Sequence, residues 1–130
     1  MMDNGYTKEE MKMSWEMKKI FDANIDVSAT CVRVPTMRSH CLSLTIECLN
    51  DVSVSDIHNV LKGNSNVVHT ELPMPIYVSK NKQIHYGRVR QSLIFGKKGI
   101  DLFVCGDQLL RGASLNAFLI GKNIIEKFLN

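Results

Sequence analysis

Arg33 and His40 are the two residues of this sequence whose types and spacing best suit chemistry on a small molecule. Each falls on the otherwise apolar side of an alternating run, where a polar group without a partner costs free energy. The guanidinium fork of arginine binds a carboxylate through two parallel hydrogen bonds, and the imidazole of histidine transfers protons near neutral pH. The pair therefore indicates acid/base chemistry on a carboxylate-bearing substrate. The alternative is that both side chains close a sheet edge, with water or backbone as partner.

The two alternating runs that carry these residues predict a β-hairpin. The first run covers residues 27–33 and the second covers residues 40–48. Pro35 has no amide hydrogen to donate, so it ends the first strand and the residues after it form the turn. Arg33 is then the last inward residue of one strand and His40 the first of the next. Because facing residues of paired strands lie ~5 Å apart at Cβ, both side chains are expected to enter one pocket.

A second pair of charged residues lies near the N-terminus. Thr7 and Glu10 form a capping box, and the good helix formers that follow predict a helix over residues 8–21. Glu9 and Lys12 are three positions apart on this helix, so they share one of its stripes. Taken alone, such a pair is typical of a solvated salt bridge.

The rest of the chain predicts further helices and strands in an order that defines the fold class. A fully apolar run over residues 100–105 is expected to be a central strand. The order along the chain is helix, two strands, helix, three strands, helix. We therefore expect class α+β, with a mixed or antiparallel sheet and helices packed on one face. The remaining elements are helices over residues 56–62 and 108–129 and strands over residues 66–72 and 84–93.

Length and composition exclude several classes of protein. A chain of 130 residues with 45% hydrophobic and 22% charged residues indicates one globular domain. The net charge of +3, from 16 basic and 13 acidic residues, is too small and too evenly spread to indicate nucleic acid. The longest apolar stretch, residues 117–120, is far short of the ~20 residues that cross a membrane.

The cysteines show no spacing typical of a metal site. The four lie in apolar runs without a C-x-x-C motif, so they are expected to be buried free thiols, with no metal bound. Free thiols indicate a reducing compartment, and we expect a cytoplasmic protein. They are Cys31, Cys41, Cys48 and Cys105.

Four segments, read together, resemble the C-terminal domain of the aspartate-semialdehyde dehydrogenase family. The resemblance covers nearly the whole chain, and its most specific strings are EEMK, CVRVPTMRSH and GDQLLRGA. It implies a fold like the C-terminal domain of glyceraldehyde-3-phosphate dehydrogenase. The segments are residues 3–20, 29–48, 86–92 and 100–117.

The resemblance also implies roles for individual residues. Glu9 would contact the substrate ammonium group, and Lys12 the phosphate. Arg33 would bind the α-carboxylate of the substrate, His40 would be the catalytic acid/base group, and Gln108 would approach the NADP cofactor. The family reaction interconverts aspartate semialdehyde plus phosphate with aspartyl phosphate, through a thioester on a cysteine, in lysine, threonine and methionine biosynthesis.

Parts of this machinery are missing from the sequence. No glycine-rich dinucleotide fingerprint is present, and none of the four cysteines looks like the family's nucleophile. We therefore expect a C-terminal piece that is inactive alone and forms a homodimer. Its missing partner would be an N-terminal dinucleotide-binding domain, and organellar targeting stays open because a signal would lie there.

The expected division of labour within the chain follows the same resemblance. Residues 1–107 would bind substrate and dimerise, and residues 108–130 would be a helix that packs on the absent domain. Without that domain, the apolar side of this helix would be exposed, recruited into an oligomer or poorly ordered. Two alternatives stay open: a related acyl-phosphate reductase such as N-acetyl-glutamyl-phosphate reductase, and a non-catalytic binding or dimerisation module.

Overall fold

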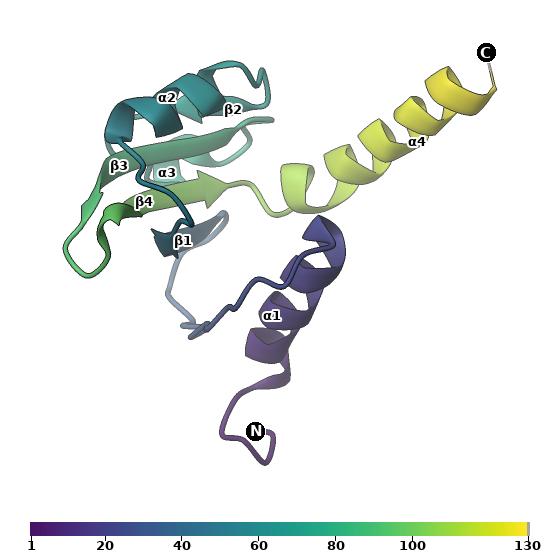
Figure 1. Cartoon of the computed structure of the whole chain (residues 1–130). Coiled ribbons are helices and arrows are strands. Elements are labelled where there is room, and N and C mark those ends of the chain that lie inside the picture. Colours follow the sequence, from purple (N-terminus) through teal and green to yellow (C-terminus); the bar gives the residue numbers. More distant parts are fainter. Residues whose placement is uncertain (130) are drawn as a thin grey trace. The chain divides into compact units, whose positions relative to one another are not determined.

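The first of two structural units, Met1–Pro35, consists of one helix and an extended segment. The computed structural model describes residues 1–129 of the chain (Figure 1). Helix α1, Lys8–Phe21, has the predicted capping box: Thr7 N donates to Glu10 Oε2 at 2.8 Å, and Glu10 N donates to Thr7 Oγ1 at 3.2 Å. The predicted first helix is confirmed.

The extended segment after α1 does not form the predicted strand. Residues 24–35 have no strand pairing, and the N–H of Cys31 donates instead to the side chain of Glu10 at 2.8 Å. Cys31 and Arg33, which the alternation predicts to point inward, are both exposed, so the prediction of a buried thiol is wrong for Cys31. The predicted hairpin between residues 27–33 and 40–48 is therefore wrong.

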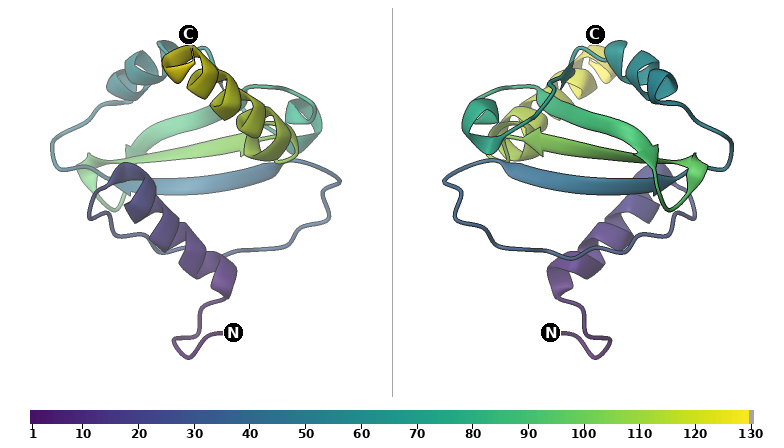
Figure 2. Two further views of the ribbon diagram at one scale, coloured as in Figure 1. Left: turned by 90° about the vertical axis from the view of Figure 1, so that its right-hand side faces the viewer. Right: turned by 90° about the vertical axis from the view of Figure 1, so that its left-hand side faces the viewer.

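The second unit, from Thr36 onward, is built on a four-stranded mixed sheet with the order β1-β4-β3-β2. The strands β1 and β3 each pair antiparallel with β4, whereas β2 pairs parallel with β3. Figure 2 shows the long strands side by side. The sheet and its helices confirm the predicted class α+β. The strands are β1 His40–Glu47, β2 Val67–His69, β3 Ile84–Ser92 and β4 Gly96–Gly106.

The core lies around β4, as its continuous apolar run predicted. Ile100 and Cys105 are fully buried on this strand, and Tyr86 of β3 is 1% exposed. On the neighbouring strand β1, Leu44 and Ile46 pair with Leu102 and Ile100 of β4, respectively. Burial of Ile100 and Leu102 on the central strand β4 stabilises the unit, whereas Ile46 on the edge strand β1 stays 41% exposed.

Within the second unit, two helices precede β3. Helix α2, Val54–Lys62, begins at Ser53, which forms a second capping box with Asp56. It packs on the sheet through His58, whose Nδ1 lies 3.2 Å from Tyr86 Oη. The short helix α3, Pro75–Val78, was not predicted from the sequence.

Strand β3 contains a β-bulge and, directly before it, a glycine in close contact with the backbone after β2. Gly87 and Arg90 pair with Phe103 and Asp101 of β4, so two residues of β3 oppose a single residue there. A Cβ at Gly87 would lie 1.9 Å from the carbonyl oxygen of Thr70. Only glycine allows this close approach of the two backbones.

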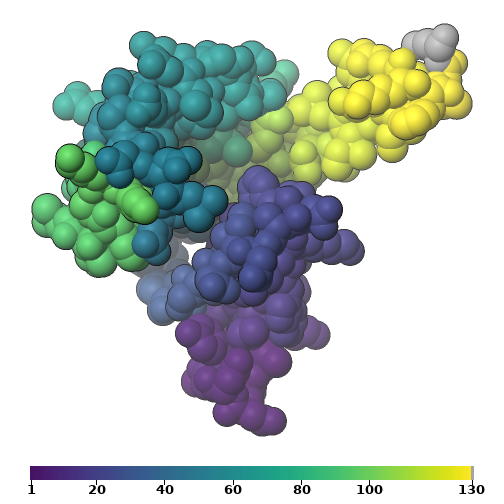
Figure 3. Space-filling model, in the orientation of Figure 1, coloured from purple at the N-terminus to yellow at the C-terminus, as the bar shows by residue number. Residues whose placement is uncertain are grey.

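The chain ends in the predicted helix, which begins with a π-helical turn. This turn, η1, spans Leu110–Ser114 and continues into α4, Leu115–Phe128. None of the residues 115–128 is buried, and α4 leads away from the end of β4 (Figures 1 and 3). Phe118 and Ile124 on α4 are 67% and 50% exposed. The functional division at residue 107 stays a prediction.

Candidate functional site

A buried carboxylate, Asp107, organises the end of the sheet where β4 leaves it. Its Oδ2 accepts a hydrogen bond from Arg38 Nε at 2.6 Å and another from the N–H of Lys80 at 2.6 Å. Its Oδ1 accepts from the N–H groups of Leu109 and Leu110 at 2.9 and 3.1 Å. One side chain thus connects the segment before β1, the turn after α3 and the start of the terminal helix.

The charge of Asp107 is held by these donors. Burial by itself raises the pKa of a carboxylic acid, but the hydrogen bonds from Arg38 and from the three backbone N–H groups outweigh it and lower the pKa of Asp107 to about 2. The carboxylate is therefore ionised at neutral pH. A charge-assisted bond to Arg38 on one side and a helix start on the other make this a strong anchor.

The same network brings His40 and Gln108 to one end of the sheet. The N–H of Ser39 donates to Gln108 Oε1 at 2.6 Å, and the Oγ atoms of Ser39 and Ser79 lie 3.1 Å apart. His40 follows directly as the first residue of β1, opposite Gly106 of β4. Two of the predicted site residues, His40 and Gln108, are therefore close together, because Gln108 is hydrogen-bonded to the residue directly before His40.

Ser39 holds an unusual backbone conformation in this bridge. Its φ is 81°, a left-handed conformation that is uncommon for any residue with a Cβ, and its side chain is 5% exposed. Such a conformation persists only where its surroundings determine it. Here the bonds to Gln108 and Ser79 do so, and they set the direction in which β1 and His40 begin.

The other three predicted site residues belong to the first unit. Lys12 Nζ lies 3.4 Å from Glu9 Oε2, and both side chains are well exposed. This is the solvated helical salt bridge that their spacing alone predicted. Arg33 is also exposed and lies in the extended segment, outside any strand. The hairpin that was expected to join Arg33 to His40 is therefore absent from the described residues.

Sequence reasoning missed Arg38 and Asp107. Both lie in the strings that carried the resemblance, but a lone arginine and a lone aspartate give no signal of a bond that spans 69 positions. The available signal was local: an aspartate directly after a buried strand and before a helix suits a cap for the first N–H groups of that helix.

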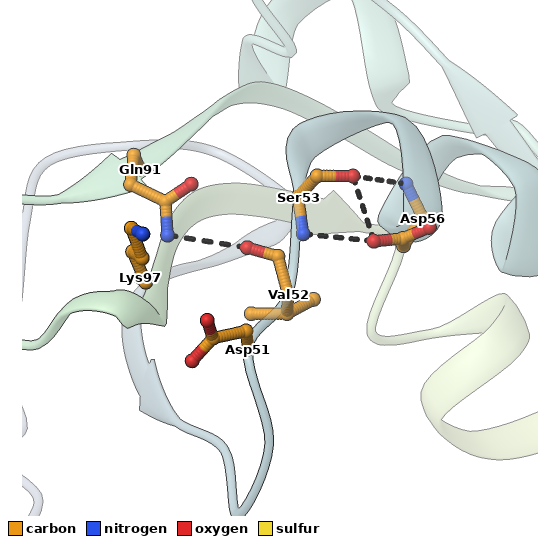
Figure 4. A pocket seen from close by; sticks show the side chains of 6 residues that line it. All are labelled: Asp51, Val52, Ser53, Asp56, Gln91 and Lys97. Atoms are coloured by element: carbon orange, nitrogen blue, oxygen red, sulfur yellow. Dashed lines mark hydrogen bonds between the residues drawn. The ribbon is translucent and has the colours of Figure 1, made fainter.

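A hollow beside the start of α2 is lined by residues that hydrogen-bond within the fold (Figure 4). Gln91 Nε2 donates to the carbonyl oxygens of Val52, Gly96 and Gly99, at 3.2, 2.6 and 2.8 Å. Ser53 and Asp56 cap α2. Gln91, Ser53 and Asp56 thus use their polar groups within the fold. Its lining residues are Asp51, Val52, Ser53, Asp56, Gln91 and Lys97.

The described residues contain neither a metal-binding cluster nor a membrane-spanning helix. Across residues 1–129, no group of three or more His, Cys, Asp or Glu side chains could hold a metal ion. In the same part of the chain, no helix is both long and apolar enough to cross a membrane.

Comparison with known proteins identifies the family. A family model described as "Semialdehyde dehydrogenase, dimerisation domain" matches residues 1–111. The chain belongs to this family. The family and the fold class predicted from the sequence are thus both confirmed.

Curated relatives and solved structures carry related names. The aspartate-semialdehyde dehydrogenase of Campylobacter jejuni is 37% identical over 131 residues, which cover 96% of this chain and 38% of the relative. That of Helicobacter pylori is 40% identical over 130 residues, with 95% and 37% covered. The crystal structure of aspartate semialdehyde dehydrogenase II from Vibrio cholerae complexed with ASA matches with a TM-score of 0.93 at 32% identity, over 98% of this chain and 39% of that one. The chain thus spans less than two-fifths of these relatives.

Proposed function

We propose that this chain provides the substrate-binding and dimerisation part of an aspartate-semialdehyde dehydrogenase. The reaction would be the phosphate-dependent interconversion of aspartate semialdehyde and aspartyl phosphate, in amino-acid biosynthesis. Support comes from the family match and from relatives of that name at 36–40% identity over almost the whole chain. The observation that carries the proposal furthest is the Ser39–Gln108 bond, because it brings two of the implied site residues together.

Within this proposal His40 is the acid/base group. It is exposed, and it stands at the first position of β1 on a segment held by Ser39 and Arg38. An imidazole held in this way can take the proton when a thiol adds to the aldehyde and return it when the adduct collapses. The buried bonds behind His40 keep its position fixed while its ring stays open to solvent.

Gln108 is proposed to face the cofactor. Its Oε1 accepts from Ser39, which fixes the orientation of the amide and leaves the NH2 group as the donor for a ligand. A carboxamide donor suits the amide oxygen of a nicotinamide. NADP, when bound, exchanges the hydride, and its main binding domain is proposed to lie outside this sequence.

Glu9, Lys12 and Arg33 are proposed to bind substrate and phosphate. Their charges match an ammonium, a phosphate and an α-carboxylate respectively. The salt bridge between Glu9 and Lys12 is exposed and long at 3.4 Å, so a ligand can replace it at little cost. We also propose a homodimer, which fits the family's description, and a cytoplasmic location, which fits the four free thiols.

A chimeric enzyme tests the proposed function. This chain would replace the matching part of the Campylobacter jejuni enzyme, and phosphate-dependent reduction of NADP with aspartate semialdehyde would be measured. We expect activity, and we expect His40→Asn to lower kcat by a factor of ~10²–10⁴, the usual contribution of a general acid/base group. His69→Asn, which changes an exposed histidine of β2, is the matched control and should leave kcat unchanged.

Other outcomes would contradict the proposal. A folded chimera that prefers N-acetyl-glutamate semialdehyde would favour the related acyl-phosphate reductase. A folded, dimeric chimera with no activity on either substrate would favour a non-catalytic dimerisation module. Equal activity of the His40→Asn variant and the unmodified chimera would remove His40 from the acid/base role.

A further inference from the structure

Two cysteines face each other near one end of the ladder between the edge strand β1 and its neighbour β4. Cys41 of β1 pairs with Cys105 of β4, and their Sγ atoms lie 3.4 Å apart. A disulfide bond is ~2.05 Å long, so the two sulfurs need to approach by about 1.4 Å to form one. The two residues are 64 positions apart in the sequence, so the fold alone creates this proximity.

The register of the ladder suits a bond between them. Antiparallel strands alternate between hydrogen-bonded pairs and non-hydrogen-bonded pairs, and the latter have Cα atoms ~4.5 Å apart with closer side chains. The N–H of Cys48 donates to the oxygen of Lys98 at 2.7 Å, which makes this a hydrogen-bonded pair. Counting seven positions back along the unbroken register, Cys41 and Cys105 form a non-hydrogen-bonded pair. Their Cα separation then falls within the range seen for disulfides.

The two thiols differ in access. Cys41 is partly exposed, whereas Cys105 is fully buried. Burial, together with the Cys41 thiol beside it, raises the pKa of the Cys105 thiol to about 12, so Cys105 stays protonated at neutral pH. A reagent from solution therefore meets Cys41 first, and Cys105 is placed to react with whatever Cys41 carries.

Metal binding does not account for the pair. His85 of β3 pairs with Cys105 from the other side, so Cys41, Cys105 and His85 form a row across three strands. Yet within residues 1–129 no three such side chains are arranged to hold a metal ion. Two thiols at this separation can instead be oxidised to a disulfide.

We propose that Cys41 and Cys105 form a reversible disulfide in response to low-molecular-weight disulfides such as glutathione disulfide. The thiolate of Cys41 attacks one sulfur of glutathione disulfide; the reagent's S–S bond breaks and one glutathione leaves as thiolate. Cys105 gives up its proton as its sulfur attacks Sγ of Cys41; the mixed disulfide breaks, and the second glutathione leaves as a thiolate that takes up this proton. The two protein thiols lose two electrons, which reduce one glutathione disulfide to two glutathione molecules.

The proposal assigns a modification site next to the candidate functional site. Cys41 follows His40 directly, and Cys105 stands two positions before Asp107. A covalent link at this point joins the two strand ends that carry those residues. In a reducing compartment such a bond is transient, as disulfides that sense redox state are.

Oxidation of the 130-residue chain with glutathione disulfide tests this site. Intact mass, thiol counting and peptide mapping would follow the products, with Cys31→Ser present throughout to prevent cross-linking through that exposed thiol. We expect two thiols to disappear without retained glutathione, and the peptides holding Cys41 and Cys105 to be joined. Dithiothreitol should restore both thiols, and the oxidised chain should have a higher Tm than the reduced one.

Three variants make the result decisive. Cys105→Ala should stop at one glutathione retained on Cys41, and Cys41→Ser should leave Cys105 unmodified. Cys48→Ser, a partly exposed cysteine that alternation places on the other face of the β1 segment, should behave as the unmodified chain. Circular dichroism would confirm that each variant is folded. A link that involves Cys48, or glutathione retained stably on Cys41 while Cys105 is present, would overturn the proposal.

Discussion

Two salt bridges, one in each unit, show how burial changes what an ion pair contributes to the stability of the fold. Glu9 and Lys12 lie 3.4 Å apart with 71% and 46% of their side chains exposed. Arg38 and Asp107 lie 2.6 Å apart with 27% and 0% exposed. The first pair contributes little to stability and is free to exchange its partner for a ligand. The second pair, desolvated and surrounded by further donors, is part of the framework.

Removal of the buried carboxylate of Asp107 is expected to have the largest effect on stability. Asp107→Ala should lower the free energy of unfolding by about 3–5 kcal/mol, because the Arg38 guanidinium and three N–H groups lose their acceptor. Urea denaturation followed by circular dichroism would measure it. If Asp107→Ala does not fold, Asp107→Asn keeps the shape and should show a smaller loss. A loss below about 1 kcal/mol for both variants would mean that Asp107 is not the anchor.

Low pH provides a second way to weaken the buried Arg38–Asp107 pair, by protonating Asp107. The pKa of Asp107 falls from 3.8 to about 2 on folding, so its stabilising contribution is complete above the higher value. That contribution is lost as the pH falls from about 4 towards 2, since protonation removes the charge that Arg38 and the N–H groups bind. Urea midpoints of the unmodified chain and Asp107→Asn should therefore converge over this range. A constant difference between them would refute the assignment.

The smallest effect on stability is expected at the exposed pair. Glu9→Gln and Lys12→Ala keep good helix formers in α1 and break only a solvated salt bridge, so the free energy of unfolding should change by less than about 0.5 kcal/mol. In the chimeric enzyme, by contrast, each should impair binding of its proposed ligand. KM for phosphate, measured with Lys12→Ala, is the readout. Loss of stability with unchanged KM would assign the pair a structural role.

Local signals predicted most of the elements. The capping box at Thr7 and the good helix formers after it predicted α1, and the apolar run after Gly99 predicted the central strand. The second helix was predicted over residues 56–62 and begins two residues earlier, at Val54. These features depend on neighbours within a few residues, so they can be read from one sequence.

Pairing partners could not be predicted in the same way. Alternation indicated that residues 27–33 are extended, but it carries no information about which edge, if any, they join. β1 instead pairs with β4, about 60 residues away in the chain. The Asp107 network depends on the same long-range geometry, with donors at Arg38 and Lys80. His40 and Gln108 were identified through a family resemblance, whereas the bond that connects them through Ser39 needed the structure.

The π-helical turn at Leu110–Ser114 sets which way α4 faces. A π-turn contains one residue more than an α-turn, and one residue corresponds to ~100° of rotation about the helix axis. Deletion of a single residue from this turn would preserve the helical content of α4 but rotate Phe118 and Ile124 to a different side. The number of residues in this turn thus determines the direction in which the apolar side chains of the terminal helix point.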